Sequence, residues 1–84
     1  MRTGIQWTGT IPANATQRWF TFGWSSAEHV VWHLMPTTPR GGAPELEWDV
    51  GVERANSNHT TYWITVRNLT PVPVTFEGRY AVLS

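Results

Sequence analysis

The 84-residue chain contains no cysteine and no lysine. Without cysteine no disulfide can support the fold, although a domain of this size buries only about 60 to 65% of the surface that its unfolded chain exposes. Large core side chains or self-association are the remaining means of support. Six Trp, three Phe and two Tyr can supply the first of these, because each buries on the order of 150 to 250 Å².

The chain also lacks an excess of charge of either sign, since six Arg balance six Asp and Glu. It therefore lacks the excess of basic residues with which proteins normally bind nucleic acids and anionic membranes. The N-terminal sequence MRTGIQWTGT has no apolar segment like that of a signal peptide, and no run approaches the length of a membrane span. We expect a soluble product or an excised module, with no nucleic-acid partner and no membrane insertion. The lack of cysteine leaves the compartment open.

Motifs for catalysis and metal binding are missing as well. There is no G-x-S-x-G motif, and Gly41-Gly42 lies between prolines instead of before a helix. His29 and His33 are four residues apart, which on a strand separates them by about 13 Å. Four acidic residues alternate along one strand, on a face that offers no cleft to raise a carboxyl pKa: Glu45, Glu47, Asp49 and Glu53. We therefore expect no enzyme, no metal and no cofactor, and we interpret the acidic residues as a charged surface that opposes aggregation.

The chain does contain apolar residues at every second position along most of its length, a pattern typical of β-strands. Six strands are expected, at residues 5–11, 17–24, 29–35, 45–53, 61–69 and 74–83. Segment 36–44, which is rich in Pro and Gly, is expected to cross between two sheets. We predict a single all-β domain over residues 1–84, a small antiparallel β-sandwich of about six strands. A partly open β-barrel is the alternative.

The alternation also predicts which side chains face the core. Trp19, Thr21 and Trp63 fall on the outward positions of their strands. The expected core residues, strand by strand, are Ile5, Trp7 and Ile11; Phe20, Phe22 and Trp24; Val30, Trp32 and Leu34; Leu46, Trp48, Val50 and Val52; Tyr62, Ile64 and Val66; and Val74, Phe76, Tyr80 and Val82.

The outward Trp63 raises the question of what covers it. If strands 45–53 and 61–69 turn around Ser57, Trp63 lies opposite Gly51 and Arg67 lies opposite Glu47, and both pairings are favourable. If strands 61–69 and 74–83 then pair, Trp63 comes near Arg79 and can form a cation–π contact. Three interpretations stay open: Trp63 is covered by its own sheet, by another copy of the chain, or by a ligand that stacks on the indole.

The layout resembles the compact six-stranded sandwiches of the H-type lectins in size, strand count, outward aromatic residues and Trp/Tyr-rich ending. That resemblance implies a sugar-binding trimer. The opening TGTIPANATQRWFTF is similar to the start of accessory β-sandwich modules found beside secreted bacterial enzymes. The chain departs from the lectins in its outward carboxylates and its Pro-Gly crossover, so no family site residue is carried across.

A tryptophan face suits the apolar face of a sugar ring, while Asp, Asn, Glu and Arg can hydrogen-bond the sugar hydroxyls. We therefore predict a non-enzymatic, lectin-like module that binds carbohydrate and self-associates into a homo-oligomer. The alternative is a structural protein whose outward tryptophans form the interface between subunits. The candidate ligand-binding residues are Trp19, Trp63 and Arg79, followed by Trp24, Asn56, Asn58 and His59 near loop ends.

Overall fold

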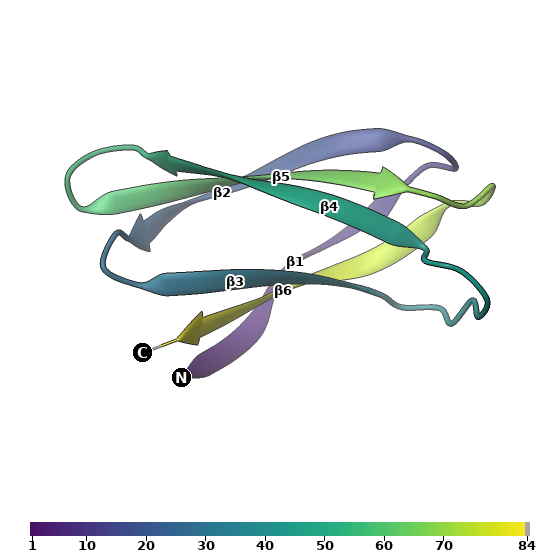
Figure 1. The fold of residues 1–84 in the computed structure, drawn as a ribbon, viewed down its shortest axis with the longest axis horizontal. Helices are drawn as coiled ribbons and strands as arrows, with labels where there is room; N and C mark the ends of the chain where they lie inside the picture. The colour runs from purple at the N-terminus through teal and green to yellow at the C-terminus, as the bar shows by residue number, and fades with distance from the viewer. Residues whose placement is uncertain (84) are drawn as a thin grey trace.

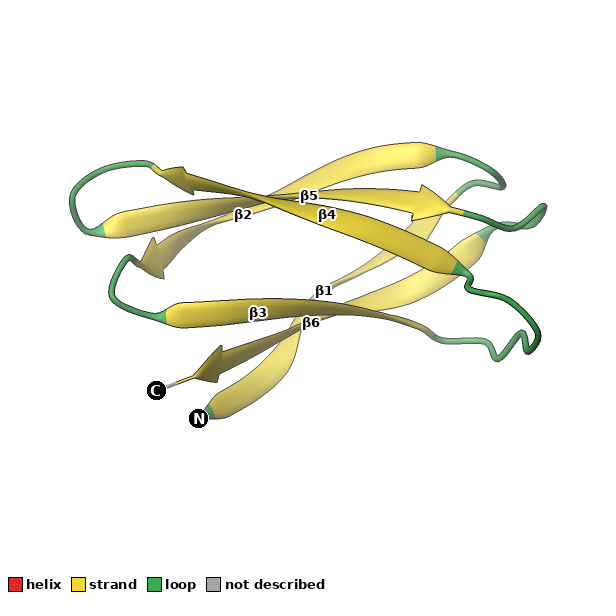
Figure 2. Cartoon of the chain, viewed as in Figure 1, coloured by secondary structure: helices red, strands yellow, loops and turns green. Residues whose placement is uncertain are grey.

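The computed structural model describes residues 1–83, which form six antiparallel strands joined by turns and loops. The strands are β1 (Arg2–Ile11), β2 (Thr16–Ser25), β3 (His29–Pro36), β4 (Leu46–Arg54), β5 (His59–Asn68) and β6 (Val74–Leu83). Sheet A has the order β1-β6-β3 and sheet B the order β2-β5-β4, and the two sheets form the two layers seen in Figures 1 and 2. The predicted β-sandwich is confirmed. No membrane-crossing helix is found among the described residues.

The chain passes repeatedly from one sheet to the other. Among the described strands, only β4 and β5 are consecutive in the chain and paired in the same sheet. The Pro- and Gly-rich segment after β3 crosses from sheet A to sheet B, as expected (Figure 1). The expected pairing of β5 with β6 is wrong, because these strands lie in opposite sheets. Pro71 and Pro73 in the short link cannot donate ladder hydrogen bonds, so this link crosses the sandwich and does not form a hairpin.

The core between the sheets is rich in aromatic rings. Its most deeply buried side chains, each at most 1% exposed, are Ile11, Leu34, Ile64, Val66 and Phe76. Trp32 and Tyr62 are also buried, and five further aromatic residues pack against the core: Trp7, Trp19, Trp24, Trp48 and Tyr80. Since aromatic side chains bury the most area per residue, they supply the apolar surface that a short chain without disulfides needs.

The predicted faces of β2 are inverted at Trp19, Phe20, Thr21 and Phe22. Trp19 points into the core and Thr21 is buried, whereas Phe20 and Phe22 are 58% and 73% exposed. A β-bulge between Thr21 and Trp24 is the cause. At this bulge Gly23 has a φ of 81°, a conformation that glycine adopts without strain. Because of the extra residue, both Trp19 and Trp24 face inward. The sequence prediction took every second residue before Trp24 as inward, and it therefore assigned the wrong face to the residues that precede the bulge.

Three other expected core positions are exposed, for two separate reasons. Ile5 lies on the outer face, because a second bulge between Ile5 and Trp7 turns it away from the core. Val50 and Val52 do lie on the inner side of β4, opposite Ile64 and Tyr62. They remain 40% and 70% exposed, because β4 is an edge strand that diverges from β3 toward its end (Figure 1).

The predicted register of the β4–β5 hairpin is confirmed at every position. Gly51 pairs with Trp63, Glu47 pairs with Arg67, and Trp48 pairs with Val66. The inward and outward positions predicted for β3 and β6 also agree with the structure, as do those of β5 except at Thr61, which was expected to face water and is only 7% exposed. This register places Trp63 on the outer face of sheet B.

Candidate functional site

The outer face of sheet B carries three aromatic side chains that lie close together. Trp63 on β5 is paired with Phe20 on β2, and the centres of their rings are 5.0 Å apart. Phe22 stacks on Phe20 with a centroid separation of 6.2 Å. We call Phe20, Phe22 and Trp63 the aromatic face. Two adjacent phenylalanine rings this exposed form an apolar surface patch, a feature that on soluble proteins often coincides with a binding surface.

Polar groups border the aromatic face. Trp63 Nε1 donates a hydrogen bond to Glu53 Oε1 at 2.7 Å. The guanidinium carbon of Arg18 lies 5.8 Å from the centre of the Trp63 ring, within reach of a cation–π interaction. Arg18 on β2 therefore takes the place that the sequence assigned to Arg79. Gly51, the neighbour of Trp63 on β4, has no side chain to cover the indole.

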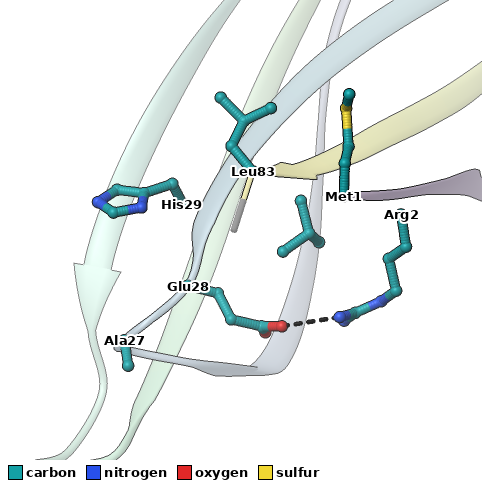
Figure 3. Close-up of a pocket in the computed structure, with 7 residues that line it drawn as sticks. Met1, Arg2, Ala27, Glu28, His29 and Leu83 are labelled. Carbon is teal, nitrogen blue, oxygen red and sulfur yellow. Dashed lines mark hydrogen bonds and ion pairs between the residues drawn. The ribbon is translucent and has the colours of Figure 1, made fainter.

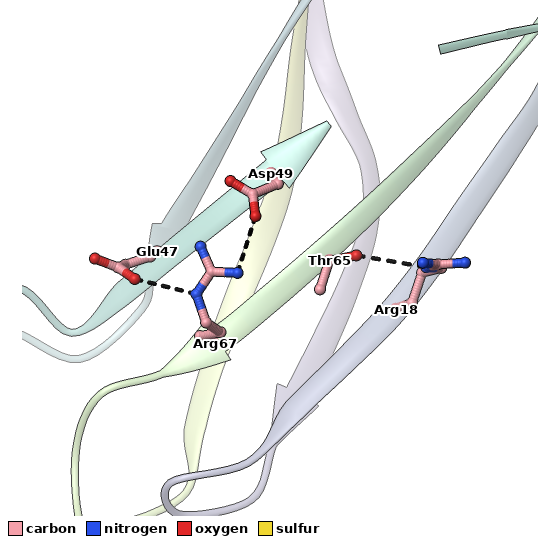
Figure 4. A network of polar contacts seen from close by, with 5 residues as sticks. All are labelled: Arg18, Glu47, Asp49, Thr65 and Arg67. Carbon is pink, nitrogen blue, oxygen red and sulfur yellow. Dashed lines mark hydrogen bonds and ion pairs between the residues drawn. The ribbon is translucent and has the colours of Figure 1, made fainter. Parts of the chain in front are cut away.

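A network of charges continues from the aromatic face along the same surface (Figure 4). Arg67 donates from Nε to Glu47 Oε1 and from NH1 to Asp49 Oδ2, each at 3.0 Å. The hydrogen bonds to Asp49 and Glu47 raise the pKa of Arg67 above its usual value. These groups are exposed, so they contribute little to stability. They place guanidinium and carboxylate groups on the same outer face of sheet B, further along the strands from Trp63.

Arg79 lies on the opposite side of the molecule. It projects from the outer face of sheet A and donates from Nε and NH2 to Glu77 Oε1, at 2.9 and 2.7 Å. Beside it is an open hollow of about 410 Å³, which we call the sheet A hollow, lined by Thr3, Gly4, Ile5, Val31, His33, Arg79, Tyr80 and Ala81. Trp63 and Arg79, predicted to meet, are therefore separated by the full thickness of the sandwich.

The three loop-end candidates Asn56, Asn58 and His59 belong to the β4–β5 turn. Asn56 Oδ1 accepts hydrogen bonds from the backbone N–H groups of Asn58 and His59 at 2.9 Å each. His59 Nδ1 lies 3.1 Å from the same oxygen. Asn56 thus closes the turn through its side chain.

The two remaining candidates face the inside of the sandwich. Trp24 packs edge-on against Trp32 at 5.4 Å and donates from Nε1 to Thr21 Oγ1 at 3.1 Å. Trp19 packs edge-on against Phe76 at 5.3 Å. Trp19 also lines a hollow of about 330 Å³ at the edge between β1 and β2, together with Gln6, Trp7, Phe20, Thr21 and Phe22. We call this hollow the edge pocket.

A further hollow, of about 430 Å³, lies beside the paired ends of β1 and β6 (Figure 3). Arg2 NH1 and Glu28 Oε2 form an ion pair across it at 2.9 Å, and the hydrogen bond that Arg2 donates to Glu28 raises the pKa of Arg2. None of the predicted ligand-binding residues lines this hollow. Within residues 1–83, no three His, Asp or Glu side chains gather in a way that could hold a metal ion.

Sequence reasoning missed Phe20, Phe22 and Arg18 as surface residues, and all three are on β2. The signal that could have found them is Gly23, since an isolated glycine in a strand often marks a bulge.

Comparison of the chain with protein-family models, with curated proteins and with solved structures finds no match. The resemblance to the H-type lectins therefore stays a prediction.

Proposed function

We propose that the chain is a non-enzymatic, lectin-like module that binds carbohydrate on the aromatic face. The observation that supports this most is the cluster of the exposed Phe20 and Phe22 with the half-buried Trp63, which has Arg18 and Glu53 at its border. A sugar ring can stack its apolar C–H face on these rings while its hydroxyls bond to the charged groups.

Glu53 is suited to such a role. One of its carboxylate oxygens accepts the Trp63 N–H, which orients the group and leaves the second oxygen to accept a sugar hydroxyl. Arg18 donates from Nε to Thr65 Oγ1 at 3.4 Å, so its terminal N–H groups remain for a second hydroxyl. Acceptor and donor thus lie on the same surface as the rings, which is the arrangement that gives a stacked ring a preferred orientation.

Replacing Trp63 by alanine is expected to weaken glycan binding at least tenfold, because the largest ring of the aromatic face is lost. The measurement is a glycan array on the parent protein, followed by titration of the best glycan with calorimetric detection. Trp63→Phe, which keeps a ring, should retain most of the affinity. Val52→Ala removes an exposed apolar group from the other side of sheet B and should change nothing. A parent protein that binds no glycan on the array would refute the proposal.

We also propose that the chain self-associates into a homo-oligomer, through the outer face of sheet A that carries the sheet A hollow. Four exposed apolar side chains lie on this outer face: Ile5, Val31, Met35 and Leu83. Arg79 and Glu77 stand next to them, two residues apart on β6. In a twofold dimer built on this face, the Arg79 of each copy can approach the Glu77 of the other, so the surface is complementary to itself. A second copy of the chain is therefore the occupant that fits it.

Val31→Glu is expected to convert the oligomer to a monomer, because it places a carboxylate in the centre of the apolar contact. Light scattering during gel filtration at micromolar concentration measures the mass directly. Trp63→Ala should leave the mass unchanged. If Trp63→Ala dissociates the oligomer and Val31→Glu does not, the aromatic face is the subunit interface and the alternative function, an assembly protein, is correct. A monomeric parent protein would contradict self-association altogether.

A further inference from the structure

Two β-bulges lie at the same open edge of the sandwich. The bulge in β1 leaves Gln6 without a partner on β6, and the bulge in β2 leaves Phe22 and Gly23 without partners on β5. Both β1 and β2 are edge strands, one in each sheet. Bulges at sheet edges re-aim side chains and are frequent beside binding sites. Here they flank the edge pocket.

The bulged Gln6 reaches from sheet A to sheet B. Its Nε2 donates to Thr21 Oγ1 at 3.2 Å, so the side chain spans the edge pocket. The amide keeps its Oε1 acceptor and a second N–H donor for a ligand. Gln6 is exposed whereas Thr21 is buried. The hydrogen bond therefore joins a side chain at the mouth of the pocket to one on its inner wall.

Aromatic rings make up the rest of the pocket wall. Trp7 and Trp19 line it, with ring centroids 6.4 Å apart. Both rings rest on Phe76, at 6.0 and 5.3 Å, and Phe76 is fully buried. The pocket is thus closed by the core, and a ligand that enters it cannot pass through.

The composition of this wall selects a class of ligand. Among the residues that line the pocket there are four aromatic rings, one primary amide and one hydroxyl, and no charged group. Rings with an amide and a hydroxyl suit an uncharged molecule that has an apolar face and several hydroxyls. The volume of about 330 Å³ lies at the small end of ligand pockets, which run from about 300 to 1,000 Å³. One sugar ring matches both the chemistry and the size.

We propose that the edge pocket binds the single terminal ring of a neutral glycan, and that the next residues of the glycan lie on the aromatic face. Phe20 and Phe22 belong to both surfaces, so a chain leaving the pocket meets the aromatic face directly. This inference rests on the proposed carbohydrate-binding function and makes it more specific. A flat face binds any stretch of a glycan, whereas a hollow with the core as its floor admits a ring from the open side and suits the end of a glycan.

The test uses methyl glycosides of glucose, galactose, mannose, fucose and N-acetylglucosamine as probes. At least one of them is expected to shift the NMR signals of the Gln6 side-chain amide and of the Trp19 indole N–H. Gln6→Ala should weaken that binding at least fivefold. Gln17→Ala, which changes an exposed glutamine of β2 outside the pocket, should not. Trp63→Ala should weaken binding of a longer glycan at least tenfold but weaken binding of the methyl glycoside of the same terminal sugar much less, because Trp63 does not line the pocket.

The possible failures are distinguishable. If an array glycan binds but no methyl glycoside shifts these signals, the carbohydrate function stands and the edge pocket is not its terminal subsite. The same holds if Gln6→Ala binds the methyl glycoside as tightly as the parent protein does. If no glycan of any length binds, both proposals are overturned.

Discussion

Replacing Asn68 by alanine is expected to lower the free energy of unfolding by about 3 kcal/mol or more. Asn68 is only 3% exposed. Its Nδ2 lies 3.2, 3.1 and 2.8 Å from the carbonyl oxygens of Ile11, Pro12 and Val72. Its Oδ1 accepts hydrogen bonds from Thr70 N and Thr70 Oγ1 at 2.9 and 2.8 Å. Alanine would leave several of these buried groups without a partner.

Asn68 therefore ties together the two turns at one end of the sandwich, between β1 and β2 and between β5 and β6. Thermal unfolding measures the loss, which should lower the Tm by roughly 12 °C or more for a domain of this size. Asn68→Asp keeps the shape but removes the donor, and it should cost at least as much. Asn56→Ala, in the exposed turn, should cost far less. If the Tm of Asn68→Ala stays within about 3 °C of the parent, these hydrogen bonds do not carry the stability assigned to them.

Replacing Gly78 by alanine is expected to cost about 3 kcal/mol through overpacking. Gly78 on β6 pairs with Trp7 on β1. A Cβ at Gly78 would lie 2.7 Å from Trp7 Cδ2 and closer still to two other atoms of the indole. The ring cannot easily move aside, because its centroid is 5.9 Å from Trp32 and 6.0 Å from Phe76 in the packed core. The added methyl group therefore forces the backbone of sheet A to shift.

Chemical denaturation of Gly78→Ala measures this cost. Gly51→Ala is the matched control on an outer face, since a Cβ there would make ordinary contact at 3.7 Å with Trp63 Cβ. It should be close to neutral. Combining Gly78→Ala with Trp7→Leu should cost less than the sum of the two single changes, because the smaller side chain makes room for the methyl group. Additive effects would show that Gly78 and Trp7 do not compete for this space.

Much of the fold could be predicted because most strands alternate without interruption. In β3, β5 and β6 the period of two runs from end to end, so the inward faces follow directly from the sequence. The β4–β5 hairpin could be placed in register for the same reason, together with its short turn. Trp63 was located in this way, and the structure puts it on the outer face as expected.

The candidate site was harder to predict because it depends on the places where the alternation breaks. Each bulge shifts the count by a residue: the one in β2 places Trp19 inside and Phe20 and Phe22 outside, and the one in β1 places Ile5 outside. The contact between Arg18 and Trp63 depends on which strand lies beside β5. The order of strands in a sheet depends on packing between residues far apart in the sequence, so it cannot be predicted from a local sequence pattern. Arg79 was placed beside Trp63 because consecutive strands often pair, a tendency that the crossing link between β5 and β6 does not follow.

The alternation of the chain between the sheets has a consequence for the order of folding. Sheet B is built from β2, β4 and β5, and all three precede β6 in the chain. In sheet A, β6 is the central strand, and β1 and β3 pair only with it. Sheet B therefore needs no strand that follows β5, whereas β1 must wait for a strand more than sixty residues away. Contacts this distant make folding slow, so sheet A is expected to assemble after sheet B, when β6 docks between β1 and β3.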